Sequence, residues 1–141
     1  MLTKETKIRV RYSETDQMQV VYHSRFLEYF EAGRTDSLRA LGMTYKSIEE
    51  QGVVMAIVQA ECKYVKPARY DDLLTIKTSI HELPKNHRIE FHQDAYNESG
   101  QLLVRGKVVL YFLDKETFTK TTIPDALHTT LQPFFEKKEN A

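Results

Sequence analysis

The amino-acid sequence predicts an α+β domain in which a curved antiparallel sheet wraps one long helix. Three observations predict this class. Residues 24–41 space their apolar side chains three and four positions apart, as an amphipathic helix does. Several other segments alternate apolar and polar residues, which is typical of half-buried strands. Short turns join these strands, and short turns imply antiparallel neighbours.

The first expected elements are a strand, a polar turn and the long helix. Residues 7–12 alternate, with Ile8, Val10 and Tyr12 on one face. The turn SETDQ follows, and Ser24 then provides an N-cap while Gly42 provides a C-terminal stop. The helix of about five turns is expected to bury one face, made of Phe26, Tyr29, Phe30, Gly33, Ser37 and Ala40.

Four further strands are expected after the helix. Residues 53–65 begin as a continuous apolar run and then alternate, which suits a strand buried on both faces at one end and on one face at the other. Residues 73–80, 87–96 and 101–114 alternate, with short turns between them. A short last helix over 123–131 begins with Pro124, at a position where a first-turn proline is tolerated.

Composition narrows the class of protein. The 141 residues fit a single domain over 1–141, with a polar tail expected to fray from about residue 136. The formal net charge is zero, which removes the usual electrostatic case for nucleic-acid binding. The longest apolar run, VVMAIV, is too short to span a membrane, and the N-terminus lacks the apolar core of a secretory signal. A single cysteine, Cys62, excludes an internal disulfide, and we expect a cytoplasmic protein.

Most candidate sites have a structural interpretation. The five histidines show no metal-ligand spacing, so no metal site is expected. Cys62 lies within a strand pattern and is expected to be a structural thiol rather than a nucleophile. Basic residues gather at predicted strand ends, where they form either a solvated rim or a phosphate-binding rim for a nucleotide-tailed ligand. These residues are Lys63, Lys66, Arg69, Lys85 and Arg88.

Asp16 stands just ahead of the long helix and has two interpretations. Spacing alone favours a turn-forming aspartate that hydrogen-bonds its own backbone. A functional role is also open, because helix N-termini carry free N–H groups and partial positive charge. A carboxylate beside such an end could face a carbonyl whose oxygen points at those N–H groups, which is what acyl transfer requires.

The stretch RYSETDQMQVVYHSRFLEYFEAGR resembles the opening motif of hot-dog-fold acyl-CoA thioesterases, most closely the 4-hydroxybenzoyl-CoA thioesterase-like family. In that motif an Asp, two variable residues, a Gly, two aliphatic residues, an aromatic residue and a His or relative precede the helix; here they correspond to Asp16 through His23. The segments ECKYVKPARYDDLLTIKTSI and NESGQLLVRGKVVLYFLD also resemble the family, so the likeness covers roughly residues 6–125. One residue departs from the motif, since Gln19 stands where the family usually has Gly.

The resemblance implies a long central helix wrapped by a five-stranded antiparallel sheet, in a homodimer or homotetramer with active sites between subunits. It implies an acyl-CoA substrate, CoA being part of the substrate rather than a cofactor, and needs no metal. Asp16 would be the nucleophile or general base, and backbone N–H groups near His23 and Ser24 would bind the carbonyl oxygen. The other expected substrate-binding residues are Tyr22, Lys85 and Arg88, and a helix acid, Glu28 or Glu31, is the alternative to Asp16.

Two other functions stay open at this point. One is an acyl-thioester hydratase or dehydratase on the same fold, which would pair a histidine such as His23 with a helix glutamate. The other is a non-catalytic acyl-CoA binding module. Release of a free thiol distinguishes hydrolysis from both.

Overall fold

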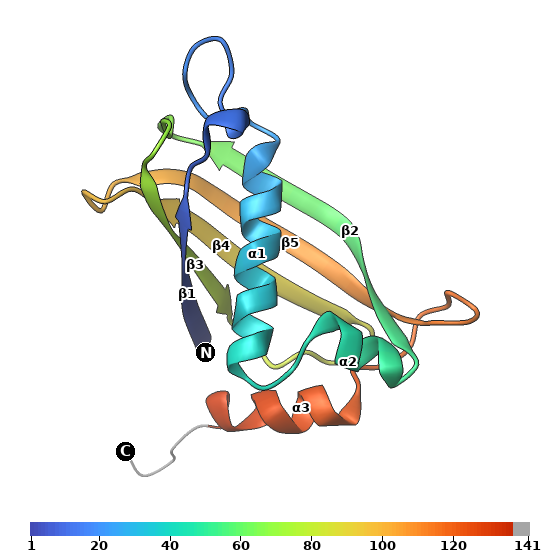
Figure 1. Cartoon of the computed structure of the whole chain (residues 1–141). Helices are drawn as coiled ribbons and strands as arrows, with labels where there is room; N and C mark the ends of the chain where they lie inside the picture. The colour runs from blue at the N-terminus through green and yellow to red at the C-terminus, as the bar shows by residue number, and fades with distance from the viewer. Residues whose placement is uncertain (137–141) are drawn as a thin grey trace.

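The computed structural model describes residues 1–136, in which five antiparallel strands form one sheet in the order β1-β3-β4-β5-β2 (Figure 1). The strands are β1 (Leu2–Arg9), β2 (Val53–Tyr64), β3 (Leu73–Ile80), β4 (Arg88–Tyr96) and β5 (Leu102–Asp114). The helices are α1 (Arg25–Ala40), α2 (Tyr45–Glu50) and α3 (Asp125–Leu131), with 3-10 turns at Tyr12–Glu14 and Gln132–Phe134. The α+β class and the five-stranded sheet are therefore confirmed. The expected fraying from about residue 136 concerns residues that lie almost entirely outside the described range.

The helix α1 crosses the sheet (Figure 1). It packs closely against the sheet because two glycines leave room at the contact. A Cβ atom on Gly33 would lie 2.8 Å from Thr78 Oγ1, and one on Gly106 of β5 would lie 2.4 Å from Phe30 Cε2. Side chains at these two positions would push the helix off the sheet. The predicted helical face is buried as expected, except that Ala40, in the last turn, is exposed.

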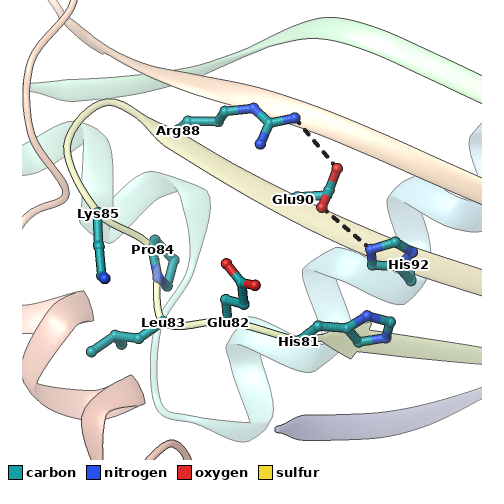
Figure 2. Close-up of a pocket in the computed structure, with 8 residues that line it drawn as sticks. All are labelled: His81, Glu82, Leu83, Pro84, Lys85, Arg88, Glu90 and His92. Atoms are coloured by element: carbon teal, nitrogen blue, oxygen red, sulfur yellow. Dashed lines mark hydrogen bonds and ion pairs between the residues drawn. The ribbon is translucent and has the colours of Figure 1, made fainter.

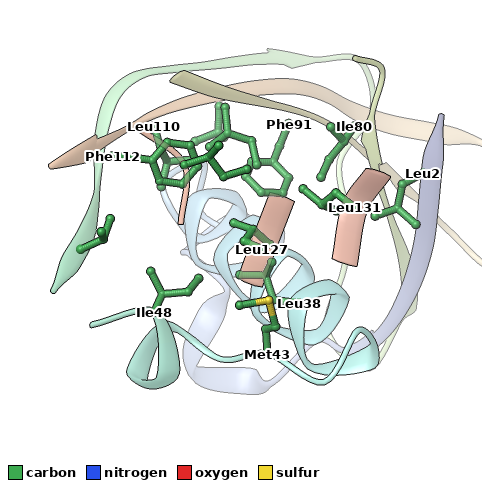
Figure 3. Packing of buried hydrophobic residues seen from close by; sticks show 14 residues of the cluster. Leu2, Leu38, Met43, Ile48, Ile80, Phe91, Leu110, Phe112, Leu127 and Leu131 are labelled. Atoms are coloured by element: carbon green, nitrogen blue, oxygen red, sulfur yellow. The ribbon is translucent and has the colours of Figure 1, made fainter. Parts of the chain in front are cut away.

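The core consists of two apolar clusters separated by a polar layer. One cluster fills the end of the sheet near α2 and α3 and includes Leu38, Phe91 and Phe112 (Figure 3). The other fills the opposite end and includes Phe26, Phe30 and Leu74.

The polar layer lies between the two clusters, and Gln93 is its centre, since each of the three hydrogen bonds below involves Gln93. Arg34 is only 3% exposed, and its Nη1 donates to Gln93 Oε1 at 3.0 Å. Gln93 Nε2 in turn donates to the Phe30 carbonyl oxygen at 2.8 Å and to Thr78 Oγ1 at 2.9 Å. No carboxylate pairs with Arg34 in the described part of the chain.

Two of the strand predictions are wrong in part. The first strand spans Leu2–Arg9 rather than 7–12, because residues 2–9 pair along the whole of β3 and the chain then turns at Tyr12–Glu14. Tyr12, expected on the buried face, is 77% exposed. The second strand is mostly exposed from Ile57 onward, because β2 is an edge of this sheet.

The short helix α2 was not predicted. Its start carries a capping box, in which Ser47 N donates to Thr44 Oγ1 and Thr44 N donates to Ser47 Oγ. A threonine three residues before a serine is a weak form of this signal, since glutamate or glutamine is usual at the second position.

Candidate active site at the N-terminal end of α1

Asp16 lies in a loop that folds back on itself before α1, the blue loop that projects beyond the sheet in Figure 1. Its backbone N–H donates to the Val20 carbonyl at 2.9 Å, and its Oδ1 accepts from Met18 N at 2.8 Å. This confirms the turn-forming interpretation of Asp16. Its Oδ2 accepts no hydrogen bond from residues 1–136. One carboxylate oxygen therefore holds the loop while the other is open to a ligand, and the two interpretations are compatible.

The loop closes through a residue with unusual backbone geometry. Gln19 has φ of +65°, and its N–H donates to the Asp16 carbonyl at 2.9 Å. Left-handed backbone costs a residue with a Cβ atom about 1–2 kcal/mol. The glycine that the family motif usually has at this position adopts such a conformation freely.

We expect Gln19→Gly to be about 1 kcal/mol more stable to unfolding than Gln19→Ala, because only glycine is relieved of the left-handed strain. The comparison with alanine removes the side chain in both variants, and Gln19 itself is exposed, so few contacts are lost. Urea denaturation of the two variants measures the difference. Equal midpoints would show that the loop does not hold this conformation.

A groove of 410 Å³ brings Asp16 together with the start of α1 and the end of β2. Asp16, Tyr22 and His23, three of the expected site residues, line it together. Most of the remaining surface is apolar, which suits an acyl chain. The other lining residues are Met18, Val20, Val21, Phe26, Tyr64, Val65, Lys66 and Pro67.

Asp16 also borders a second hollow. This hollow measures 650 Å³ and is more polar, with Thr15, Gln17 and Gln19 in its wall. Tyr12 and Tyr70 complete it, their rings 5.6 Å apart and edge to face. Asp16 thus lines both an apolar groove and a more polar one.

The two residues just before α1 present unpaired backbone donors next to this groove. Tyr22 N donates to the Glu14 carbonyl at 3.0 Å, but among residues 1–136 the N–H groups of His23 and Ser24 have no acceptor. Ser24 occupies the N-cap position, as predicted, although its side chain makes no capping hydrogen bond and Ser24 is not among the residues that line the groove. The helix tip therefore keeps the free N–H groups and the partial positive charge that an anionic oxygen requires.

Glu14 anchors the loop and α1 to each other, a role that the sequence did not suggest. Its buried carboxylate accepts from Arg11 N at 2.7 Å and from the Tyr29 hydroxyl at 3.0 Å. Burial opposes ionisation of Glu14, but these hydrogen bonds and the Arg11 side chain outweigh it and lower the pKa of the carboxyl group. The Glu14 side chain is thus held as a carboxylate.

Lys85 and Arg88 lie at the other end of the sheet, where they line a separate pocket of 290 Å³ (Figure 2). Arg88 Nη2 lies 3.3 Å from Glu90 Oε1, and His92 Nε2 lies 3.4 Å from Glu90 Oε2. Partial burial opposes ionisation of Glu90, but the neighbouring Arg88 and His92 outweigh it and lower the pKa of Glu90. Within one chain, the structure does not bring Lys85 and Arg88 to Asp16.

The remaining candidates are the other basic residues and the two helix acids. Among them only Lys66 lines the Asp16 groove. Lys63 and Arg69 are exposed. On α1, Glu28 is exposed and pairs with Arg25 at 3.0 Å, and Glu31 is exposed. Neither glutamate lines the groove, so the helix-acid alternative gains no geometric support.

Two further features concern the described residues as a whole. Residues 1–136 hold no group of three metal-ligating side chains close enough to share an ion. No helix in this range has both the length and the apolar character needed to cross a membrane.

The fold and the groove define a hot-dog α+β protein with an acid beside the helix N-terminus. A family model described as the thioesterase-like superfamily matches residues 10–131. The chain therefore belongs to the thioesterase-like superfamily, as its motif indicated.

Individual relatives agree with this assignment. A putative acyl-CoA thioesterase, YneP, from Bacillus subtilis is 33% identical over 118 residues, which cover 84% of this chain and 85% of the relative. The acyl-CoA thioester hydrolase YbgC from Escherichia coli is 28% identical, covering 85% of this chain and 89% of the relative. The crystal structure of a DHNA-CoA thioesterase from Staphylococcus aureus has a TM-score of 0.86 and 27% identity, covering 95% of this chain and 91% of that one.

Proposed function

We propose that this protein is a thioester hydrolase that cleaves acyl-CoA to a free acid and CoA, with Asp16 as its nucleophile or general base. One observation carries the proposal: Asp16, whose carboxylate keeps one oxygen open, and His23, whose N–H has no acceptor among residues 1–136, line a single groove. Family membership and the acyl-CoA thioesterases among the relatives support the reaction class.

The thioester carbonyl oxygen points at the N–H groups of His23 and Ser24. Negative charge develops on that oxygen during attack, and each donor in such a site contributes about 3 kcal/mol to stabilising it. In one route Asp16 attacks the carbonyl carbon, the C–S bond breaks, and water then hydrolyses the resulting anhydride. In the other, Asp16 takes a proton from the water that attacks.

The leaving group explains why no further catalytic acid is needed. An alkyl thiol has a pKa of about 8.5, so CoA departs as a thiolate and takes up a proton afterwards. Tyr22 and His23 form the wall of the groove around the reacting carbon. The acyl chain enters the apolar groove beyond them, towards Phe26 and Val65.

The expected homodimer explains how Lys85 and Arg88 would serve the same site. Among residues 1–136, no strand pairs with the outer edge of β2, which exposes Ile57 and Val58, so a second copy can pair with it. Antiparallel pairing about a two-fold axis sets the start of one β2 beside the end of the other. Arg88 lies level with the start of β2, through Tyr111, so a second copy would bring its Lys85 and Arg88 towards the Asp16 end of the first.

In this arrangement, the two basic residues bind the phosphates of CoA while Asp16 of the other copy acts on the thioester. Light scattering after size exclusion is expected to give at least twice the mass of one chain. A single-chain mass at working concentrations would contradict the shared site.

A thiol-release assay over a panel of acyl-CoA thioesters tests the proposed reaction. The panel includes short, long and aromatic acyl groups, and each acyl group is also offered on pantetheine, which lacks the nucleotide. We expect thiol release with at least one acyl-CoA, and a higher KM for its pantetheine counterpart because the phosphates are missing. Saturable binding without thiol release would indicate a binding module, and a change in enoyl absorbance without thiol would indicate a hydratase.

A further inference from the structure

Tyr64 joins the end of β2 to the start of α1. Its hydroxyl donates to the carbonyl oxygen of His23 at 2.8 Å, across 41 residues of sequence. Its ring lies edge to face with the rings of His23 and Phe26, at centroid distances of 6.3 and 6.0 Å. Tyr64 also lines the Asp16 groove. This contact fixes one particular peptide unit at the helix tip.

That peptide unit links residues 23 and 24. In a planar trans peptide, the carbonyl oxygen and the N–H of the next residue point in opposite directions. The carbonyl of His23 also receives the N–H of Phe26 at 3.4 Å, so it points along the helix. The N–H of Ser24 therefore points the other way, out of the helix tip, where no acceptor among residues 1–136 meets it.

We infer that Tyr64 is a positioning residue for the oxyanion site. Its hydroxyl holds the peptide between His23 and Ser24 in the orientation that aims the Ser24 N–H at the thioester carbonyl oxygen. This inference rests on the proposed function and deepens it, because it names the residue that prepares one of the two donors.

Two physical effects give Tyr64 this role. The first is orientation: residues 23 and 24 precede the regular turns of α1, so the helix ladder does not restrain their peptide as it restrains later ones. The second is polarisation, since a hydrogen bond to a peptide carbonyl makes the N–H of the same peptide a stronger donor. Partial burial, with Cys62 nearby, raises the pKa of Tyr64 to about 12, so the hydroxyl keeps its proton at neutral pH.

Tyr64→Phe tests the inference because it removes the hydroxyl and keeps the ring. We expect kcat/KM to fall about tenfold, less than the loss on deleting an oxyanion donor outright, with part of the loss in KM because the carbonyl oxygen of the bound substrate already meets the Ser24 N–H. Tyr64 is 48% exposed, so the melting temperature should stay close to that of the unchanged protein. Tyr45→Phe makes the same chemical change on α2, away from the groove, and should leave the kinetics unchanged.

Binding of two unreactive substrate analogues separates positioning from a merely structural role. One is a ketone, in which a methylene group replaces the thioester sulfur and the carbonyl oxygen is kept. The other is a thioether, which lacks the carbonyl oxygen. We expect Tyr64→Phe to weaken binding of the ketone about tenfold and to leave binding of the thioether unchanged.

The outcomes are distinct. Absence of thiol release by the unchanged protein over the whole panel would defeat the proposed function. If thiol is released but Tyr64→Phe matches the unchanged protein in kcat/KM and in both affinities, the positioning role is wrong. Equal weakening of the ketone and the thioether would also overturn it, since that pattern indicates a general distortion of the groove.

Discussion

Asp16→Asn is expected to lower kcat for the best acyl-CoA substrate by about 10³-fold, the middle of the range for losing a positioned base. Asparagine retains an oxygen that can accept from Met18 N, so the loop should keep its fold. It removes the negative charge that either attacks the carbonyl or accepts the proton of water. Steady-state thiol release, with circular dichroism to verify folding, measures the effect.

Glu28→Gln is the matched control for this experiment. It neutralises an exposed acid on the first turn of α1 by the same chemical change, and it also tests the helix-acid alternative. We expect its kcat to stay within about twofold of the unchanged protein. A large loss of kcat in Glu28→Gln, together with full activity in Asp16→Asn, would assign the catalytic role to Glu28 on the helix instead.

Gln93→Leu is expected to lower the free energy of unfolding by about 3 kcal/mol, because it leaves a buried cation without its acceptor. Arg34 Nη1 loses Gln93 Oε1, and the Phe30 carbonyl and Thr78 Oγ1 lose their donor in the same substitution. Leucine has a similar volume, so the loss should come from the polar groups rather than from a cavity. Denaturant unfolding at equilibrium measures it.

A double-mutant cycle distinguishes this cause from a packing defect. Arg34→Met removes the buried charge, so Gln93→Leu added to Arg34→Met should cost less than Gln93→Leu alone, by about 2 kcal/mol. If the losses in the free energy of unfolding were additive, Gln93 would stabilise the core independently of Arg34.

Regular elements with a clear pattern were predictable from the sequence. The strand expected over 73–80 is β3 (Leu73–Ile80), and the helix expected over 24–41 is α1 (Arg25–Ala40), because each has a continuous pattern of its own period. The first strand was misplaced because two of its inward positions, Lys4 and Thr6, are polar and hide the alternation. Its place is set by pairing with β3, which a local pattern does not contain.

The grouping of the candidate site residues was predictable only where they are adjacent in sequence. Asp16, Tyr22 and His23 belong to one motif and line one groove, as expected. The Tyr64 hydroxyl bond to His23 joins residues 41 positions apart, and the bond between Tyr29 and Glu14 joins residues 15 apart. Neither contact follows from periodicity or spacing, because each depends on how the strands and helix come together.

Gln93 shows the same limit within the core. The alternation expected over residues 87–96 puts Ile89, Phe91 and Ala95 on one face of β4, and all three are buried. Gln93 shares that face and is fully buried, although glutamine is usually an exposed residue. Its partner, Arg34, looks from the sequence like an ordinary charged helix residue.

The hydrogen bonds from Gln93 have a consequence for how α1 settles on the sheet during folding. Hydrophobic attraction is not directional, whereas a hydrogen bond has a definite length and angle, so the bond from Gln93 to the Phe30 carbonyl fixes the position of α1 along its axis more sharply than the apolar contacts do. If α1 shifted along its axis by one turn, about 5.4 Å, the guanidinium of Arg34 would be moved into one of the two apolar clusters. The contact between Arg34 and Gln93 thus fixes the position of α1 on the sheet. Because the middle of the helix is fixed, its N-terminal end is placed beside Asp16.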